Sequence, residues 1–331
     1  MLKALAFAAL CLLAPLAAQA DDFTLGLPIA CTPGRDCWIA NYFDRDAAPG
    51  VKDVGCGART YDGHDGTDFA LRDLKAMEAR VDVVAAAPGR VKGMRDGMAD
   101  VNVKVAGRQS VAGKECGNGV VLDHGGDWET QYCHMRKGSI AVRNGQEVAA
   151  GEKLGTVGLS GFTEFPHAHL TVRKNGVAVD PFDGHRADGT CAAVGTSLWK
   201  PELRTAVVYE PMVLFASGFA GLVPSQAAAE RGDLDGTALS PSAPVLALWI
   251  RAFGIEPGDE LTLRVTGPDS KPVFESTQKA EKRQAALFAF AARKRPPDGA
   301  WPKGAYRGEA TLVRGGAKPL TRSIQAEAEL R

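Results

Sequence analysis

Apolar residues occur along this chain in short runs separated by turn residues, a pattern typical of β-strands. The turn residues Gly125-Gly126 predict that 120–124 and 128–134 pair as a hairpin, and Asn175-Gly176 predicts a later one. We therefore expect an antiparallel β fold before residue 200, with no helix longer than two turns. The expected strands cover 81–87, 89–94, 101–105, 111–113, 120–124, 128–134, 147–148, 154–158, 167–173 and 177–179.

Residues 201–331 show the same kind of pattern. Strands are expected over 245–250, 260–265 and 304–313, separated by turn sequences such as Glu256-Pro257-Gly258-Asp259. Short strands at this spacing are typical of a small immunoglobulin-like β-sandwich. The segment 278–295, rich in Ala, Lys and Arg, is compatible with a helix or with a pair of polar strands. No catalytic constellation occurs here, which favours a targeting or packing module.

The first twenty residues have the pattern of a secretory signal peptide. Lys3 is followed by an apolar run over 4–13, and Ala18-Gln19-Ala20 supplies the small residues of a cleavage site. A membrane anchor is disfavoured because the run is shorter than the roughly 18 apolar residues that a span needs. Cys11 lies inside the run and follows the bulky Leu10, which disfavours a lipoprotein. We expect an exported protein, most simply periplasmic with an extracellular location as the alternative, and with residues 1–20 removed.

Length and composition add the domain count and exclude some partners. The chain has 331 residues, 45% hydrophobic and 24% charged, as expected of about two folded domains. Lys plus Arg and Asp plus Glu both number 39, so a nucleic-acid partner is not expected. All six His and every Cys lie before residue 192. We therefore expect one domain over 21–200, with its core at about 60–182, and an accessory domain over 201–331.

Apart from Cys11, the chain holds an even number of Cys, which in an exported protein predicts disulfides. Two pairs have a local reason: 31 with 37 across a turn, and 116 with 133 across the expected hairpin. The pair 56 with 191 would then tie the ends of one domain, although the sequence leaves other pairings open. A thiolate metal site or thiol nucleophile is disfavoured because no C-x-x-C occurs. The six residues are Cys31, Cys37, Cys56, Cys116, Cys133 and Cys191.

Several His and Asp residues have the spacing of a metal site. His64 and Asp68 are separated by three residues, and His167 and His169 by one. If 167–173 is a strand, its period of two places both of the latter imidazoles on one face. Two His and one Asp are a plausible ligand set for zinc, with a fourth position left for water. His134, on the expected hairpin, is a further candidate, and the combination is more specific than either pair alone.

These motifs, in this order, resemble the lysostaphin/LytM-type zinc metallopeptidases, which are peptidoglycan endopeptidases with an antiparallel β core. The resemblance covers roughly residues 60–182 and does not extend to 21–55 or to the tail. It is carried by Gly63-His64 to Asp68, by 120–134, by His167-Ala168-His169 and by Asp180-Pro181.

The resemblance implies one zinc ion per chain, held by His64, Asp68 and His169, with His134 and His167 as the catalytic pair. Zinc makes a water acidic near neutral pH and polarises a carbonyl. No H-E-x-x-H supplies a glutamate base, so one of the pair is expected to accept the water proton. The other would stabilise the oxyanion or protonate the leaving amine, and the two roles are not assigned individually.

The chain departs from the family pattern at two places. Ala168 stands where a large apolar residue is common, and 163–165 (Thr-Glu-Phe) replaces a smaller, glycine-containing approach. Both departures bear on the width of the substrate groove. Residues 21–55 are a candidate inhibitory flap. Packing, turn or solvated roles are favoured for His124, Asn118, Trp38 and His185, whereas Asp65 and Asp123 are weaker candidates for orienting an imidazole.

Two classes of function fit these residues. The first is an exported zinc endopeptidase that hydrolyses peptide cross-links of peptidoglycan. The second is a catalytically inactive module that binds peptidoglycan or activates another hydrolase. Because all five expected site residues are present, the enzyme is favoured. A peptidase acting on proteins would share the same site. The compartment favours a D-Ala–diaminopimelate cross-link over a glycine-rich bridge as the bond cleaved.

Overall fold

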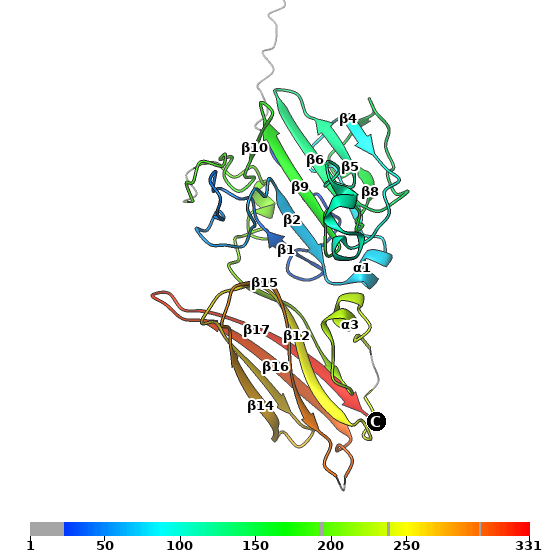
Figure 1. The fold of residues 1–331 in the computed structure, drawn as a ribbon, viewed down its shortest axis with the longest axis vertical. Helices are drawn as coiled ribbons and strands as arrows, with labels where there is room; N and C mark the ends of the chain where they lie inside the picture. Colours follow the sequence, from blue (N-terminus) through cyan, green and yellow to red (C-terminus); the bar gives the residue numbers. More distant parts are fainter. Residues whose placement is uncertain (1–22, 192–194, 237–238, 298) are drawn as a thin grey trace, which may run out of the picture.

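The computed structural model describes residues 23–191, 195–236, 239–297 and 299–331; the expected signal peptide lies outside them. The described chain is nearly all β, as predicted, and forms two units, one above the other in Figure 1. The short helices α1 (Leu74–Glu78) and α3 (Gln226–Arg231) lie where the two units meet. No helix within the described residues is long and apolar enough to cross a bilayer.

An antiparallel sheet of eight strands forms the first unit, in the order β1-β2-β9-β6-β5-β4-β7, with β10 paired to β9. The predicted hairpin is confirmed, because β5 pairs with β6 across the turn at Gly125-Gly126. The strands are β1 (Cys37–Asn41), β2 (Thr67–Leu71), β4 (Gly89–Arg95), β5 (Asn118–Asp123), β6 (Trp128–Met135), β7 (Glu147–Val148), β9 (His167–Lys174) and β10 (Val177–Val179).

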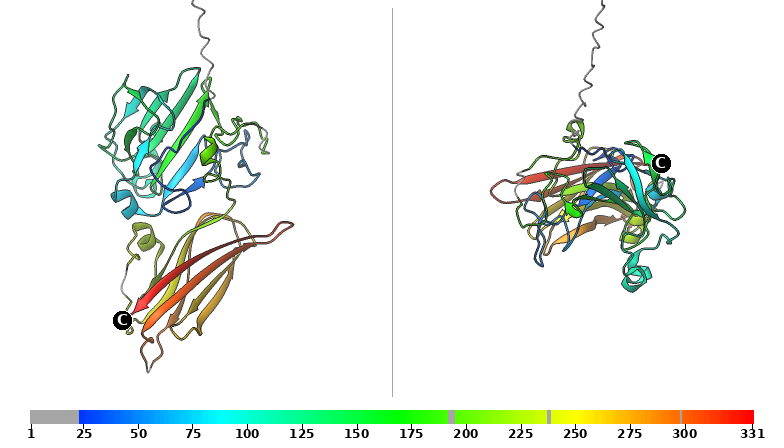
Figure 2. Two further views of the ribbon diagram at one scale, coloured as in Figure 1. Left: turned by 180° about the vertical axis from the view of Figure 1, so that it is seen from behind. Right: turned by 90° about the horizontal axis from the view of Figure 1, so that it is seen from above.

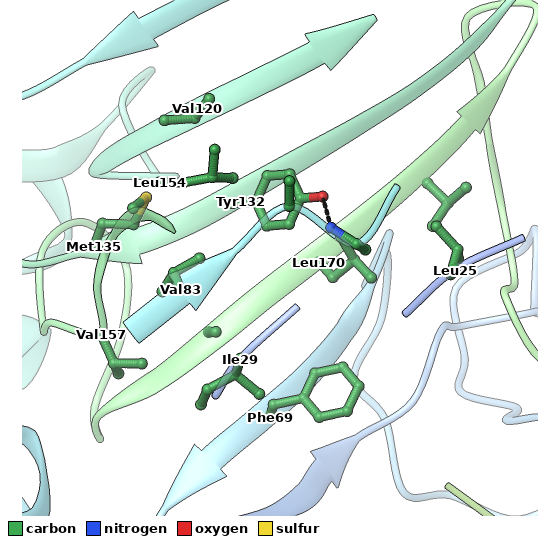
Figure 3. Packing of buried hydrophobic residues seen from close by; sticks show 14 of the residues in the cluster. Leu25, Ile29, Phe69, Val83, Val120, Tyr132, Met135, Leu154, Val157 and Leu170 are labelled. Atoms are coloured by element: carbon green, nitrogen blue, oxygen red, sulfur yellow. Dashed lines mark hydrogen bonds between the residues drawn. The ribbon is translucent and has the colours of Figure 1, made fainter. Parts of the chain in front are cut away.

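The core lies between this sheet and a two-stranded sheet made by β3 (Asp82–Val84) and β8 (Lys153–Thr156). Figure 3 shows Val83 and Leu154 from the small sheet beside Tyr132 and Leu170 from the large one. The Tyr132 hydroxyl is satisfied inside the core, because it accepts the Ala86 N–H at 2.8 Å. Burial of these side chains fixes which face of β6 and β9 points away from the core.

The predicted strands over 101–105 and 111–113 are wrong. The chain forms the helix α2 (Val103–Ala106) and the 3-10 helix η1 (Arg108–Val111) there. The Asn102 side chain caps α2 by accepting the N–H of Lys104. Val105 is 81% exposed, so its apolar side chain does not pack into a buried core. This segment is a surface excursion between β4 and β5, and the sequence pattern did not distinguish it from strands.

Residues 23–61 are built into the first unit. Leu25 and Ile29 are buried in its core, and β1 forms the edge of its sheet. The fully buried Arg45 donates to Asp180 and Asp183, which ties this extension to the end of the first unit. The extension is therefore structural, as opposed to a flap that lies over the sheet.

Three disulfides join described residues of the first unit, and they are the three pairs suggested by the sequence analysis. Cys31–Cys37 closes the turn before β1, and Cys116–Cys133 links the approach to β5 with β6. Cys56–Cys191 spans 135 residues and ties the extension to the end of the unit.

The second unit is a seven-stranded sandwich, confirming the predicted sandwich. Its sheets have the orders β11-β12-β15 and β14-β13-β16-β17. The fourth strand pairs with the third, whereas constant-type immunoglobulin domains pair it with the fifth. The uncertain segment 278–295 belongs mostly to strands. The strands are β11 (Val213–Ala220), β12 (Val245–Ile255), β13 (Glu260–Thr266), β14 (Pro272–Lys279), β15 (Gln284–Lys294), β16 (Gly304–Arg314) and β17 (Leu320–Leu330), and the 3-10 helix η2 (Pro201–Leu203) precedes them.

Candidate metal centre

The candidate site lies where the middle strands of the first unit run side by side (Figure 2). His167 and His169 alternate along β9 with Ala168 and Leu170, which face the core. The strand predicted over 167–173 is confirmed, so both imidazoles lie on the face away from the core. Asp68 on β2 is directly opposite His169 in the antiparallel register. His64 sits in the loop just before β2 and is buried.

A β-bulge brings His134 to the same face. Between the pairs Asn118↔Met135 and Val120↔Tyr132, two residues of β6 oppose only Gly119 of β5. Regular alternation would turn His134 toward the core, because Cys133 pairs with His169 on the site face. Instead His134 adopts φ 61°, and its ring lies 4.6 Å from that of His167. Such a backbone conformation costs a non-glycine residue about 1–3 kcal/mol and persists where surrounding contacts impose it.

Three atoms converge at the buried centre of this face. His169 Nδ1 lies 2.8 Å from Asp68 Oδ1, and His64 Nε2 lies 3.2 Å from both of these atoms. Tetrahedral ligands of zinc, about 2.0–2.1 Å from the ion, are separated from one another by about 3.3 Å. The spacing is thus close to that of a tetrahedral site, and the donor set is one that zinc prefers.

Each ligand side chain has a hydrogen-bond partner on its outer side, which leaves a lone pair of its inner atom facing this centre. The carbonyl of Tyr42 can only accept, so His64 Nδ1 donates to it at 2.6 Å and Nε2 keeps its lone pair. His169 Nε2 lies 2.9 Å from the Thr171 hydroxyl and 3.3 Å from Asp65. Asn41 donates to Asp68 Oδ2 at 2.8 Å, which leaves Oδ1 facing the imidazoles. Partners of this kind orient metal ligands in proteins.

In His134 and His167, one ring nitrogen is likewise committed to a hydrogen bond with the backbone. His134 Nδ1 donates to the carbonyl of Ser160 at 2.8 Å, and His167 Nδ1 donates to that of Phe165 at 3.0 Å. Each Nε2 therefore carries a lone pair when the ring is neutral. His167 Nε2 lies 3.3 Å from Asp68 Oδ1, beside the converging atoms. Two proton acceptors thus flank the candidate metal position.

The charges of the site follow from burial and these contacts. Burial alone raises the pKa of Asp68, but the imidazoles of His64 and His167 outweigh it and hold this pKa well below its usual value. Burial and the neighbouring imidazoles lower the pKa of His134 well below its usual value, so this ring is neutral at neutral pH. Burial disfavours charge on His169, yet hydrogen bonds to Asp65 and Asp68 outweigh it and raise its pKa to about 9. The carboxylates thus favour a positive charge here, whether a proton or a bound cation.

An open hollow of about 220 Å³ gives access to the site. His134 and His169 line it, and the Cys116–Cys133 disulfide forms part of its wall. The ring of Tyr61 also lines it and lies 4.3 Å from the His64 ring. A ligand that occupies this hollow would therefore meet His134 and one of the three converging residues, His169.

Other candidate groups are less suited to a metal. Cys31 and Cys37 lie near Asp36, but their sulfurs are joined in a disulfide. His134, His167 and His169 form a second group within 4.8 Å that shares His169 with the first and lacks a carboxylate.

Two predictions about single residues can be compared with the structure. Asp65 does contact a site imidazole, that of His169. His124 lies at the far hairpin end, where it bonds the carbonyl of Pro88 and the hydroxyl of Thr130. The sequence did not single out Asn41, Ser160 or Thr163, because each acts through the backbone or through another side chain.

Comparisons with known proteins agree with this geometry. Residues 62–181 match the model of peptidase family M23. An uncharacterised metalloprotease of Haemophilus influenzae is 32% identical over 36% of this chain and 20% of its own length. The peptidoglycan DD-endopeptidase ShyA of Vibrio cholerae is 38% identical over 19% of this chain and 14% of its own length. The chain therefore spans a fifth or less of the curated relatives' lengths.

A solved catalytic domain is similar to part of this chain over nearly its own whole length. A mutant catalytic domain of the M23 protein EnpA from Enterococcus faecalis is 23% identical and covers 48% of this chain and 95% of that one, with a TM-score of 0.32. The residues that carry the candidate metal centre all fall inside the matched range, whereas Asn41 and Tyr42 precede it. The part of the chain that is similar to peptidase family M23, residues 62–181, therefore contains the candidate metal centre.

Proposed function

We propose that the chain is a zinc endopeptidase that hydrolyses peptide cross-links of peptidoglycan. The observation that carries the proposal is the convergence of His64, Asp68 and His169 beside the paired rings of His134 and His167. The match of residues 62–181 to a peptidase family model and the similarity to a named peptidoglycan endopeptidase support the reaction and the substrate class.

His64, Asp68 and His169 would hold the metal through Nε2, a carboxylate oxygen and Nδ1. This set is preferred over the three-imidazole group because its three atoms lie 2.8–3.2 Å apart and because the Asp68 carboxylate offsets part of the cation's charge. When bound, zinc supplies Lewis acidity, which polarises a carbonyl and makes a water acidic near neutral pH. The outer hydrogen bonds of Tyr42, Asn41 and Asp65 hold the three donors in place.

The two remaining imidazoles supply proton transfer. His134 and His167 each have Nδ1 committed to a backbone carbonyl, so Nε2 is the atom that can accept a proton. One Nε2 takes a proton from the attacking water. The other ring, carrying a proton taken up from solvent, would hydrogen-bond the developing oxyanion or give that proton to the departing amine.

We also propose that the mature chain works outside the cytoplasm, in the periplasm. Three disulfides in the first unit need an oxidising compartment to form and persist. The peptidoglycan that the proposed reaction requires is found there. The competing hypothesis, a module that binds peptidoglycan without cleaving it, predicts no need for five intact site residues.

The test is the zinc content of the purified mature chain, measured together with muropeptide release from sacculi. We expect one zinc per chain and release that stops with EDTA and returns with added zinc. His169→Ala is expected to lose both zinc and release while keeping its circular dichroism spectrum. Bound zinc without any release from sacculi would contradict the endopeptidase. Wild-type protein that binds no zinc when the metal is supplied would contradict the site itself.

A further inference from the structure

A row of aromatic rings connects the β-sandwich to the catalytic half of the site. The Phe165 ring lies 4.7 Å from the His167 ring and 6.1 Å from the Phe253 ring of β12. Phe253 stacks on Phe215 of β11 at 4.2 Å, and Phe215 lies 5.5 Å from Trp38 of β1. Two side chains of the second unit thus lie between Trp38 and Phe165 of the first.

Phe165 contacts His167 in two ways. Its ring lies against the imidazole, with 33° between the planes. Its carbonyl accepts the His167 Nδ1–H at 3.0 Å, the bond that leaves Nε2 as the proton acceptor. The Thr163 hydroxyl donates to the same carbonyl at 2.8 Å. A shift of Phe165 would therefore move both the support and the hydrogen-bond partner of the imidazole.

The sandwich residues in this row are fixed, whereas Phe165 is only half-buried. Phe253 and Phe215 are 4% and 3% exposed, and they belong to an apolar cluster that joins both units. Phe165 is also part of the segment 163–165, where the sequence departs from the family pattern. The departure supplies a large ring that reaches the sandwich.

Polar contacts hold the second unit against the same edge of the first. Arg251 of β12 donates to the carbonyl of Arg72, and Lys75 donates to that of Gly232 at 2.7 Å. The neighbouring Leu71 N–H donates to the carbonyl of Pro166 at 2.9 Å, directly before His167. The segment that leads into β9 is thus held between β2 and the sandwich.

We propose that the β-sandwich positions the imidazole of His167 through the contact of Phe253 with Phe165. Both phenylalanines are positioning residues, since neither lines the hollow that leads to the site. The second unit is then part of the catalytic apparatus, beyond any role in targeting. The expected change in kcat rests on the function proposed above, whereas the expected change in the position of the His167 ring does not.

The experiment compares Phe253→Ala with Phe219→Ala in the full-length, zinc-loaded mature chain. Phe219 is a buried phenylalanine of the same sandwich, but it belongs to the sandwich's own core. We expect Phe253→Ala to lower kcat on purified cross-linked muropeptide dimers by about 10- to 100-fold, with KM and zinc content little changed. Phe219→Ala should lower the Tm without this loss of kcat. Phe253→Leu, which keeps much of the contact, should recover most of the rate.

The ring position is read independently from the imidazole ¹⁵N signals of His167, assigned with His167→Gln. Phe253→Ala is expected to shift these signals and Phe219→Ala to leave them in place. Unchanged His167 signals in Phe253→Ala would overturn the proposal, as would equal losses of kcat in the two variants. An inactive wild type would overturn the proposed reaction, and the signals would still decide whether the sandwich positions the ring.

Discussion

The two units of this chain are built in contrasting ways. Strands of the second unit run for 7–11 residues, and β16 pairs with β17 over eleven consecutive positions without a register shift. Strands of the first unit run for 2–8 residues and include bulges in several ladders. All the His and disulfides belong to this irregular unit.

The contrast shows where irregular backbone is useful. The sandwich buries its apolar residues by alternation, and its two register shifts, at 214–216 and 265–266, carry no residue of the candidate site. Regular alternation would place His134 on the core face of the sheet. A β-bulge places it on the site face instead. The Cys116–Cys133 disulfide and the hydrogen bond from the His134 N–H to the Cys116 carbonyl, 2.8 Å, hold that bulge.

The largest effect expected from this contrast concerns the catalytic pair. His134→Ala and His167→Ala should each lower kcat by about 100- to 10,000-fold, because each removes one proton-transfer group. Both variants should keep their zinc, since the three expected ligands remain. The measurement is muropeptide release with zinc content on the same samples. His185→Ala, a His-to-Ala change in a loop of the first unit, is the control, and wild-type rates in either site variant would refute the assignment.

A second prediction concerns the β-bulge, which an added side chain at Gly119 should disturb. A Cβ added to Gly119 would lie 2.4 Å from the Tyr132 carbonyl and 2.9 Å from Cys116 Sγ. Gly119→Ala should therefore lower the free energy of unfolding by about 1–3 kcal/mol, as overpacking does. Chemical denaturation measures this change. Gly93→Ala is the matched control, because it also lies beside a register shift in this sheet but its added Cβ meets nothing within 4 Å. Equal stability of the two variants would contradict this account.

Period-two alternation was enough to predict much of the fold and the shared face of two of the five candidate site residues. It placed His167 and His169 on one face, and turn residues located the β5–β6 hairpin. It could not predict that His134 leaves the core face, because a bulge depends on how two strands pair. The alternating valines at 101–105 misled the same reasoning, because strand formation depends on burial and the Val105 side chain is exposed.

Contacts between distant segments were also beyond the sequence. Asn41 and Tyr42 are ordinary residues in a stretch outside the family resemblance, yet they hold Asp68 and His64. Their role comes from the pairing of β1 with β2, which joins segments about 27 residues apart. The ring of Phe165 was noticed only as a departure from a pattern, and its partner Phe253 lies in the other unit.

Asn41 gives a third prediction, because it extends the site beyond the family match. Asn41→Ala removes the donor to Asp68 Oδ2 and should weaken zinc binding about 10- to 100-fold, as loss of an outer partner of a metal ligand does. Competition with a chelator of known affinity measures the zinc dissociation constant. Asn102→Ala, at the cap of α2, is the control for loss of a surface Asn. An unchanged dissociation constant in Asn41→Ala would show that Asp68 needs no such partner.

The smallest effect is a pH dependence confined to one unit. Burial lowers the pKa of His124, which bonds the Pro88 carbonyl and the Thr130 hydroxyl. The unfolded chain then binds more protons than the folded one as the pH falls below about 6.5, so stability is lost on acidification. We expect His124→Gln to flatten the part of this dependence that His124 causes, measured by denaturation of metal-free protein between pH 5 and 7.

Hydrogen exchange resolved by peptide separates the two units in this experiment. After correction for intrinsic exchange rates, the wild-type and His124→Gln curves should differ for β5 and β6, which flank His124. The second unit has no His, so its peptides should show no such difference between the two proteins. An equal difference in both units would mean that the units open as one cooperative body. In that case the two units would differ in their local geometry but would unfold together, joined by the row of aromatic rings between them.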